Sequence, residues 1–457
     1  MTQLVSFKVD KLLGHFTHEV FFKDESEFVI LHGPNGVGKT KMLELLEAVL
    51  KFDIFSIADS KFESIALRFS GGERLVVTNN ATRKRVHSER HYADIDVTFS
   101  LIVRKGAAVT GNVKLNRTEL PPSLWREIQS DISQSAEVDA SPSAKLQALF
   151  HAGSGFAPPR YRGTRQLASH AGGIFNVDEF NTDIVEFLDK FSVHLVETQR
   201  LLILEAASDP RRRSASEQPQ RMKVAECARD LARHLARALT DNSRKSQALD
   251  KSFPRRVLDE DVVPDTNRIR EVYAEQSQLR NRLAAIALLD ESMDVPLQGG
   301  ELLEWQRKVL WTYLRDSQQK LDTFQDLLLR VELFKSIIGK RFLFKRMLID
   351  REYGFRFESV ADRQPIYPSQ LSSGEQHEIV LVYDLLFKVK PGSLVLIDEP
   401  EISLHVAWQQ EFISDIQRIA HLSKLRFVVA THSPQIINEW WSQTVGLRAP
   451  ASLESGE

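Results

Sequence analysis

The sequence has little cysteine, no long apolar run and almost no net charge. Its 457 residues include one cysteine, Cys227, which excludes an internal disulfide and cysteine metal clusters. No stretch approaches the roughly 20 apolar residues of a membrane-spanning helix, and the first residues lack a signal-peptide pattern. A net charge of −2 means that any contact with nucleic acid must come from a local patch. We expect a cytoplasmic globular protein of at least two lobes, without membrane contact.

The N-terminal part predicts strands around one helix. Helical spacing covers Lys39–Leu50 and Asp183–Phe191, whereas residues 105–175 are rich in Gly, Ser, Ala and Pro and show no clear pattern. Alternating or apolar runs predict strands at Leu4–Val9, Glu19–Phe22, Phe28–His32, Ser64–Phe69, Arg74–Thr78, Ile95–Arg104 and the start of Val193–Leu204.

A helical insertion separates these strands from a second group. Asp209–Gln220 reads as a polar linker, and helical periods follow from Ile269 to Ile286 and, as one run, from Leu302 to Val331. Pro296 and Gly299-Gly300 lie between the two runs and predict an antiparallel helical hairpin. Strands return at Phe344–Ile349, Gly354–Glu358, Leu394–Ile397 and Arg426–Ala430. The pattern predicts an α/β nucleotide-binding head with an antiparallel β subdomain, split into lobes 1–205 and 341–457 by a helical insertion at 206–340.

A phosphate-binding loop follows the strand that ends at His32. Gly33-Pro34-Asn35-Gly36-Val37-Gly38-Lys39-Thr40 fits G-x-x-x-x-G-K-[ST] between a strand and a helix, as this motif requires. Gly36 and Gly38, with Asn35, allow backbone N–H groups to curl around phosphate oxygens. Lys39 is expected to reach the β- and γ-phosphates of ATP, and Thr40 to ligate Mg²⁺.

Two acids end a buried strand near the C-terminus. Leu394-Val395-Leu396-Ile397 leads directly into Asp398-Glu399, and carboxylates at the end of a buried strand are costly unless they face a site. With a phosphate-binding loop upstream, Asp398 is expected to hold the Mg²⁺ shell, and Glu399 to position and polarise the attacking water. The alternative is a solvated acidic turn.

A third segment resembles the ABC signature, usually written LSGGQ. Leu371-Ser372-Ser373-Gly374-Glu375-Gln376 differs from it at Ser373 and Glu375. By itself the segment is a serine-capped helix start, with the helix expected over Glu375–Phe387. The resemblance implies an ABC-type P-loop ATPase that works as a head-to-tail homodimer or higher oligomer. Ser372 and Gly374 would then contact the nucleotide of the opposite subunit.

Two further residues resemble catalytic positions of the same family. Thr431-His432-Ser433-Pro434 follows a buried strand and resembles the switch-histidine loop, which implies that His432 contacts the γ-phosphate. Gln199 loosely resembles the glutamine that senses the metal and the attacking water.

One departure places the chain in a particular branch. His405 stands where transporters and SMC proteins usually carry aspartate, and Glu401-Ile402-Ser403-Leu404-His405 is typical of AAA_21 and OLD-like ATPases. The sequence ends about 25 residues after His432, so we expect no Toprim nuclease domain. The chain therefore resembles the ATPase subunit of anti-phage systems such as Septu or PARIS, which implies a separate nuclease or Toprim-type effector as partner.

Three functional classes remain open. The first is a defence ATPase that controls an effector, and the second is an SMC- or RecF-like ATPase that clamps or repairs DNA. The third, a transporter subunit, fits poorly with the long insertion between Gln199 and Leu371. DNA clamping needs a basic face, for which the candidates are Arg83-Lys84-Arg85 with Arg90, Arg160-Arg162-Arg165, and Arg211-Arg212-Arg213. Each is more often a solvated loop, so nucleic-acid binding is possible but open.

Overall fold

The computed structural model describes two compact units. The described residues are 2–23, 26–80, 95–102, 108–115, 141–153, 175–176, 180–197, 219–261, 263–290, 297, 299–402 and 404–448. The first unit comprises Met1–Gln199 with Lys390–Glu457, and the second comprises Arg200–Val389. The two units divide the chain at places other than the three predicted segments, and that three-part division stays a prediction.

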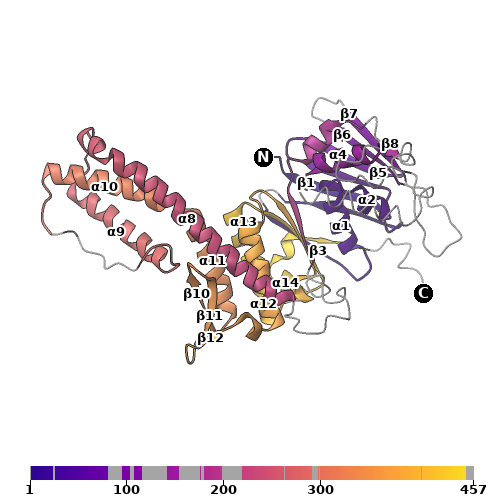
Figure 1. The fold of residues 1–457 in the computed structure, drawn as a ribbon. Coiled ribbons are helices and arrows are strands. Elements are labelled where there is room, and N and C mark those ends of the chain that lie inside the picture. Colours follow the sequence, from indigo (N-terminus) through magenta and orange to yellow (C-terminus); the bar gives the residue numbers. More distant parts are fainter. Residues whose placement is uncertain are drawn as a thin grey trace, which may run out of the picture. The chain divides into compact units, whose positions relative to one another are not determined.

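The first unit contains a parallel five-stranded sheet, of which β3 (Phe28–His32) is labelled in Figure 1. Its strands are strongly apolar, and all five residues of the strand Leu394–Asp398 are buried, as expected for a sheet covered on both faces. Helix α1 (Lys39–Leu50) packs on this sheet, while α13 (Val406–Ser423) and α14 (Pro434–Ile437) pack on each other. The strand order is β15 (Thr444–Gly446), β3 (Phe28–His32), β14 (Arg426–Thr431), β13 (Leu394–Asp398) and β9 (Val193–Glu197).

A seven-stranded antiparallel sheet completes the first unit. Alternation along its strands turns apolar side chains such as Phe7, Val77 and Phe99 into a core shared with α1. The first unit also contains the helices α2 (Ile54–Asp59), α4 (Pro142–Gly153) and α6 (Thr182–Leu188). The strand order is β2 (Phe16–Phe21), β1 (Leu4–Leu12), β4 (Ser64–Phe69), β5 (Arg74–Asn79), β6 (Ile95–Ile102), β7 (Ala108–Leu115) and β8 (Phe175–Asn176).

The second unit joins a helical array to a small antiparallel sheet. Helix α8 (Pro219–Leu258) has 40 residues, or about 60 Å at 1.5 Å per residue. Gly354 has a positive φ of 75°, and a Cβ there would lie 1.8 Å from the carbonyl oxygen of Ala228, so glycine allows β11 to approach α8. The other elements are α9 (Thr266–Ala284), α10 (Glu304–Asp322), α11 (Gln325–Arg341), β10 (Lys345–Asp350), β11 (Gly354–Ser359), β12 (Pro365–Ile366), α12 (Ser373–Tyr383) and a π-helical turn at Asp384–Lys388.

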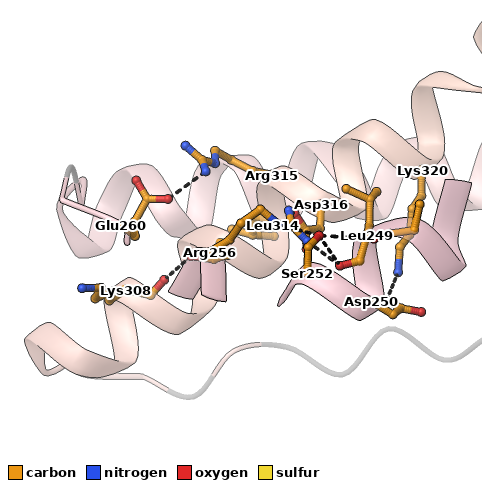
Figure 2. Close-up of polar contacts among 12 residues, drawn as sticks. Leu249, Asp250, Ser252, Arg256, Glu260, Lys308, Leu314, Arg315, Asp316 and Lys320 are labelled. Carbon is orange, nitrogen blue, oxygen red and sulfur yellow. Dashed lines mark hydrogen bonds and ion pairs between the residues drawn. The ribbon is translucent and has the colours of Figure 1, made fainter. Parts of the chain in front are cut away.

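Polar contacts join the C-terminal half of α8 to α10 (Figure 2). The Arg256 guanidinium pairs with the buried carboxylate of Asp316 and also donates to the Leu249 carbonyl oxygen at 2.6 Å. Arg315 pairs with Glu260 at 2.8 Å, and three further contacts, Lys320–Asp250, Lys308–Leu258 and Asn242–Lys320, extend the row. A buried charge is tolerated only when it is paired, so these contacts fix how α8 and α10 face each other.

The predicted fold class is confirmed, and the structure adds detail to the insertion. Helix α8 was not predicted as an element, and the run from Leu302 to Val331 is two helices rather than one. The break has a local cause: the Asn242 side chain donates to the Lys320 carbonyl at 2.7 Å and to the Thr323 hydroxyl at 3.0 Å, which satisfies the end of α10.

Three apolar residues of that run do not reach the core. The exposed fractions are 64% for Trp305, 37% for Val309 and 48% for Tyr313. The buried positions of α10 include polar Thr312 and Asp316 instead, because this side faces the polar surface of α8.

Candidate functional site

The phosphate-binding loop closes tightly between β3 and α1. Gly36 and Gly38 have φ values of 86° and 90°, a conformation that disfavours side chains, and Gly38 is the residue just before α1. A Cβ on Gly33 would lie 2.4 Å from a backbone carbonyl oxygen. The Lys39 Nζ donates to the carbonyl oxygens of Gly33 at 3.1 Å and Pro34 at 3.3 Å. The loop therefore forms a cradle with its lysine curled inside and Asn35 exposed at the tip.

Thr40 and Asp398, the two predicted Mg²⁺ ligands, meet beneath this loop. The Thr40 hydroxyl donates to Asp398 Oδ2 at 2.8 Å. Burial, with smaller contributions from Glu399 and Glu44, raises the pKa of Asp398 to about 6, although the Thr40 hydrogen bond and Lys39 act in the opposite direction. A hydroxyl and a carboxylate are oxygen ligands that Mg²⁺ prefers. The donor set fits this ion, with Thr40 and Asp398 as the residues that would hold it.

Glu399 has a strained backbone directly after β13. Its φ is +46°, in the left-handed region that non-glycine residues rarely adopt, and its N–H donates to the Ala430 carbonyl oxygen at 2.9 Å. Strain of this kind concentrates at functional positions. Its Oε1 lies 3.8 Å from His432 Nε2, so the conformation aims the carboxylate toward the predicted switch histidine.

His432 follows β14 at the same edge of the sheet as the phosphate-binding loop. Parallel register pairs Thr431 with His32 and Ala430 with Asp398, so β3, β13 and β14 end together. The His432 ring contacts the Lys39 Nζ. Burial lowers the pKa of Lys39, while Glu399, Asp398 and Glu401 oppose the shift. The structure thus brings together Lys39, Thr40, Asp398, Glu399 and His432.

Two residues that the sequence analysis did not select position the histidine loop. Glu401 accepts a hydrogen bond from the Thr431 hydroxyl at 2.8 Å and another from the His432 backbone N–H at 2.6 Å. Gln409 of α13 accepts from the Ser433 hydroxyl at 2.7 Å and donates to the Leu404 carbonyl at 3.2 Å. Glu401 follows Pro400 as the third acid of the segment that begins at Asp398, but no local pattern connects it to a loop 30 residues away.

The signature-like segment belongs to the second unit and is a capped helix start. The Ser372 hydroxyl accepts from the Glu375 N–H at 3.3 Å, and the Ser372 N–H donates to Glu375 Oε2 at 2.8 Å, a reciprocal capping box. Burial alone would raise the pKa of Glu375, but Lys345 and Ser372 outweigh it and hold the pKa below its usual value. The Lys345 Nζ lies 2.6 Å from the carboxylate. Glu375, the departure from LSGGQ, therefore anchors the loop to β10.

Three predicted site residues stay untested by this cluster. Gln199 lies outside the described residues. Gly374 and Ser372 are held within the second unit, so their predicted contact with nucleotide stays a prediction. The basic segments at 83–90, 160–165 and 211–213 also lie outside the described residues.

Comparison with known families decides the classification. Residues 161–438 match the family described as "AAA_21: AAA domain, putative AbiEii toxin, Type IV TA system", which is more than half of the chain. The chain belongs to the AAA_21 family. It is an ATP-binding ATPase, and no described helix of this AAA_21 protein is long and apolar enough to cross a membrane.

Similar proteins include one from a retron. The chain is 35% identical over 89 residues to the Retron Ec83 probable ATPase of Escherichia coli, a match that spans 17% of this chain and 16% of that protein. Two solved structures are distantly similar. The Smc head domain from Pyrococcus furiosus has a TM-score of 0.35 and 13% identity, covering 98% of this chain and 94% of that one. The SMC head domain from Thermotoga maritima has a TM-score of 0.31 and 11% identity, covering 97% and 94%.

Proposed function

We propose that this AAA_21 protein hydrolyses Mg-ATP as a head-to-tail dimer and regulates a separate effector in an anti-phage defence system. The observation that carries the hydrolysis proposal is the cluster of Lys39, Thr40, Asp398, Glu399 and His432 at one edge of the parallel sheet. A cation, a hydroxyl–carboxylate pair and a second carboxylate near a histidine supply the groups that phosphoryl transfer needs.

Each residue of this cluster has a proposed role that follows from its position. The loop from Gly33 to Gly38 binds the phosphates through backbone N–H groups, and Lys39 turns from its loop carbonyls toward the β- and γ-phosphates. Thr40 and Asp398 hold Mg²⁺, which neutralises phosphate charge when it is bound. Glu399 orients the attacking water and accepts its proton, and His432 donates to the γ-phosphate. Gln199, two residues beyond β9, is the proposed sensor of that water.

The dimer supplies the remaining contacts. Ser372 and Gly374 of a second copy reach the γ-phosphate, because a capped helix start presents hydroxyl and N–H donors to an anion. In the described state the Ser372 hydroxyl also lies 3.0 Å from Glu375 Oε2. A nucleotide phosphate therefore competes with Glu375 for this hydroxyl. Ser372 contacts nucleotide only when a second subunit presents the phosphate.

The effector role is supported by what the relatives are called. The family description reads "putative AbiEii toxin, Type IV TA system", and the E. coli relative is called "Retron Ec83 probable ATPase". In both names the ATPase is one part of a larger system, which supports a partner-dependent role. The proposed partner is a nuclease or Toprim-type protein whose release or activation follows dimer geometry.

Two substitutions test the hydrolysis proposal. Glu399→Gln keeps ATP binding, reduces turnover by at least about a hundredfold, and accumulates an ATP-bound dimer in light scattering. Glu411→Gln, an exposed carboxylate on α13, is the matched control and keeps normal turnover. Ser372→Arg blocks turnover but not nucleotide binding. Normal hydrolysis by Glu399→Gln would remove its role as base, and normal hydrolysis by Ser372→Arg would remove the shared site.

The effector role has its own test. Co-expression of the protein with the product of a neighbouring gene, followed by affinity purification with and without ATP, is expected to recover a complex whose stability depends on nucleotide. A complex that is indifferent to ATP and to Glu399→Gln would contradict the regulatory role while leaving the ATPase proposal intact.

A further inference from the structure

Helix α8 carries a straight line of basic residues on its solvent-facing side. The six residues of this basic stripe, all exposed, are Arg229, Arg233, Arg237, Arg244, Lys251 and Arg255. Steps of four and seven residues return to the same face of a 3.6-residue helix, so the six lie within an arc of about 80°. At 1.5 Å per residue the stripe is about 39 Å long.

The opposite side of α8 is fixed in the unit, so the stripe cannot turn inward. Val224, Cys227, Leu231 and Leu235 are at most 1% exposed, and they point away from the stripe by about half a turn. Farther along, the Arg256 ion pair to α10 holds the C-terminal half of the helix (Figure 2). The basic stripe is therefore presented on a rigid support.

The charge of this surface contrasts with that of the whole chain. Helices α8, α9 and α10 together carry 18 lysines and arginines against nine aspartates and glutamates, a net charge of +9, whereas the chain has −2. Three stripe residues face nearby acids: Arg233–Asp230 at 2.8 Å, Arg244–Asp241 at 3.7 Å and Arg255–Asp259 at 3.4 Å. Exposed pairs of this kind contribute little and yield readily to a stronger anion. Within the described parts of the chain, the other three stripe residues form no ion pair.

We propose that the basic stripe of α8 binds the phosphate backbone of duplex nucleic acid without reading its sequence. Five of the six residues are arginine, which matches phosphate geometry better than lysine. The stripe has no exposed aromatic residue on which an unpaired base could stack. Its length of about 39 Å corresponds to about 11 base pairs at 3.4 Å each, so the stripe can lie along one side of about one turn of duplex.

The test measures binding of the full-length protein to a fluorescent 30-base-pair duplex by anisotropy between 50 and 200 mM NaCl, without nucleotide. Six phosphate contacts predict a slope of about −5 in a plot of log K against log salt, or about a thousandfold weaker binding across this range. The combined variant Arg237→Gln, Arg244→Gln, Lys251→Gln is expected to lower the slope by about 3.

A matched control separates the stripe from overall charge. Arg268→Gln, Arg346→Gln, Arg356→Gln removes the same charge from exposed positions of the same unit outside α8, and is expected to bind as the wild type does. Because the duplex is measured without ATP, failure here leaves the ATPase proposal untouched.

Four outcomes decide the proposal. A stronger response to duplex DNA or to duplex RNA would support it and name the source of the phosphates. Tighter binding to a single strand or to polyglutamate than to duplex would overturn it, as would no salt-dependent binding or an equal loss in both triple variants.

Discussion

The Asp398→Asn substitution should stabilise the nucleotide-free protein while it removes metal binding. Asp398 is 7% exposed, and burial raises the pKa of its carboxyl to about 6 from 3.8. A folded-state pKa above the unfolded one means that the folded protein binds more protons between these values. Stability from this group is therefore greatest below about pH 4 and falls as the pH rises through about 6. At pH 7 the ionised carboxylate opposes folding until a cation neutralises it.

The size of the expected stability change follows from the pKa shift of Asp398. About two pKa units at 1.36 kcal/mol each set an upper limit of about 3 kcal/mol for the cost of ionised Asp398 at pH 7. The asparagine oxygen still accepts the hydrogen bond that Thr40 donates at 2.8 Å, so the substitution removes charge and leaves this contact. At about 2 °C per kcal/mol for a unit of this size, Tm in EDTA should rise by at most about 6 °C.

The measurement is Tm of the wild type and of Asp398→Asn in four conditions: EDTA at pH 7, EDTA at pH 5.5, Mg²⁺ alone and Mg-ATP. The gain in Tm should be largest in EDTA at pH 7, shrink at pH 5.5 as the wild-type carboxyl becomes protonated, and reverse in Mg-ATP, which stabilises only the wild type. A variant that is less stable than the wild type in EDTA would refute the desolvation argument. An unchanged shift with Mg-ATP would refute the metal assignment.

Three other substitutions test particular contacts. Glu401→Ala should lower kcat by about 10- to 100-fold with little change in the KM for ATP, because two hydrogen bonds that place the His432 loop are lost; Glu401→Gln, which keeps an acceptor oxygen, should recover part of this rate. Arg256→Ala should destabilise the second unit by about 3–5 kcal/mol in urea unfolding, because it leaves the Asp316 carboxylate buried without its cation. Arg256→Met combined with Asp316→Leu should recover most of the lost stability. Gly33→Ala should weaken ATP binding in a fluorescent-nucleotide titration, because its Cβ would overlap a backbone carbonyl oxygen at 2.4 Å.

The nucleotide-binding half of the site was predictable from local sequence. β3 and α1 have the predicted bounds, Phe28–His32 and Lys39–Leu50, because a buried apolar run and a strict helical period are both local signals. Thr40 and Asp398 were each predicted as Mg²⁺ ligands from their motifs, and the structure brings the two side chains into contact. What local sequence could not supply is Glu401, whose partners are chosen by the pairing of β13 with β14.

The helices of the second unit were harder to predict because many contacts between α8 and α10 are polar. Trp305 and Tyr313 have the spacing of a buried helix face and yet are exposed. Asp316 is buried and pairs with Arg256, which lies 60 residues earlier in the chain. The stripe on α8 was readable from its four- and seven-residue steps, but only after α8 itself is known as a continuous helix with Pro254 inside it. Proline in a helix interior removes one backbone hydrogen bond, so sequence patterns tend to end a helix there.

The Asp230 carboxylate contacts both the basic stripe and the signature helix. Asp230 of α8 accepts a hydrogen bond from the Tyr383 hydroxyl of α12 at 2.8 Å, while its other oxygen lies 2.8 Å from the Arg233 guanidinium of the basic stripe. α12 is the helix that the signature residue Ser372 caps. A phosphate that draws Arg233 away would leave Asp230 with Tyr383 and with His234, whose Nε2 lies 3.5 Å from the carboxylate. Duplex binding and the placement of the signature helix therefore share a contact within one unit. Linkage requires any such coupling to be reciprocal: if duplex favours the ATP-bound dimer, ATP must tighten duplex binding by the same factor.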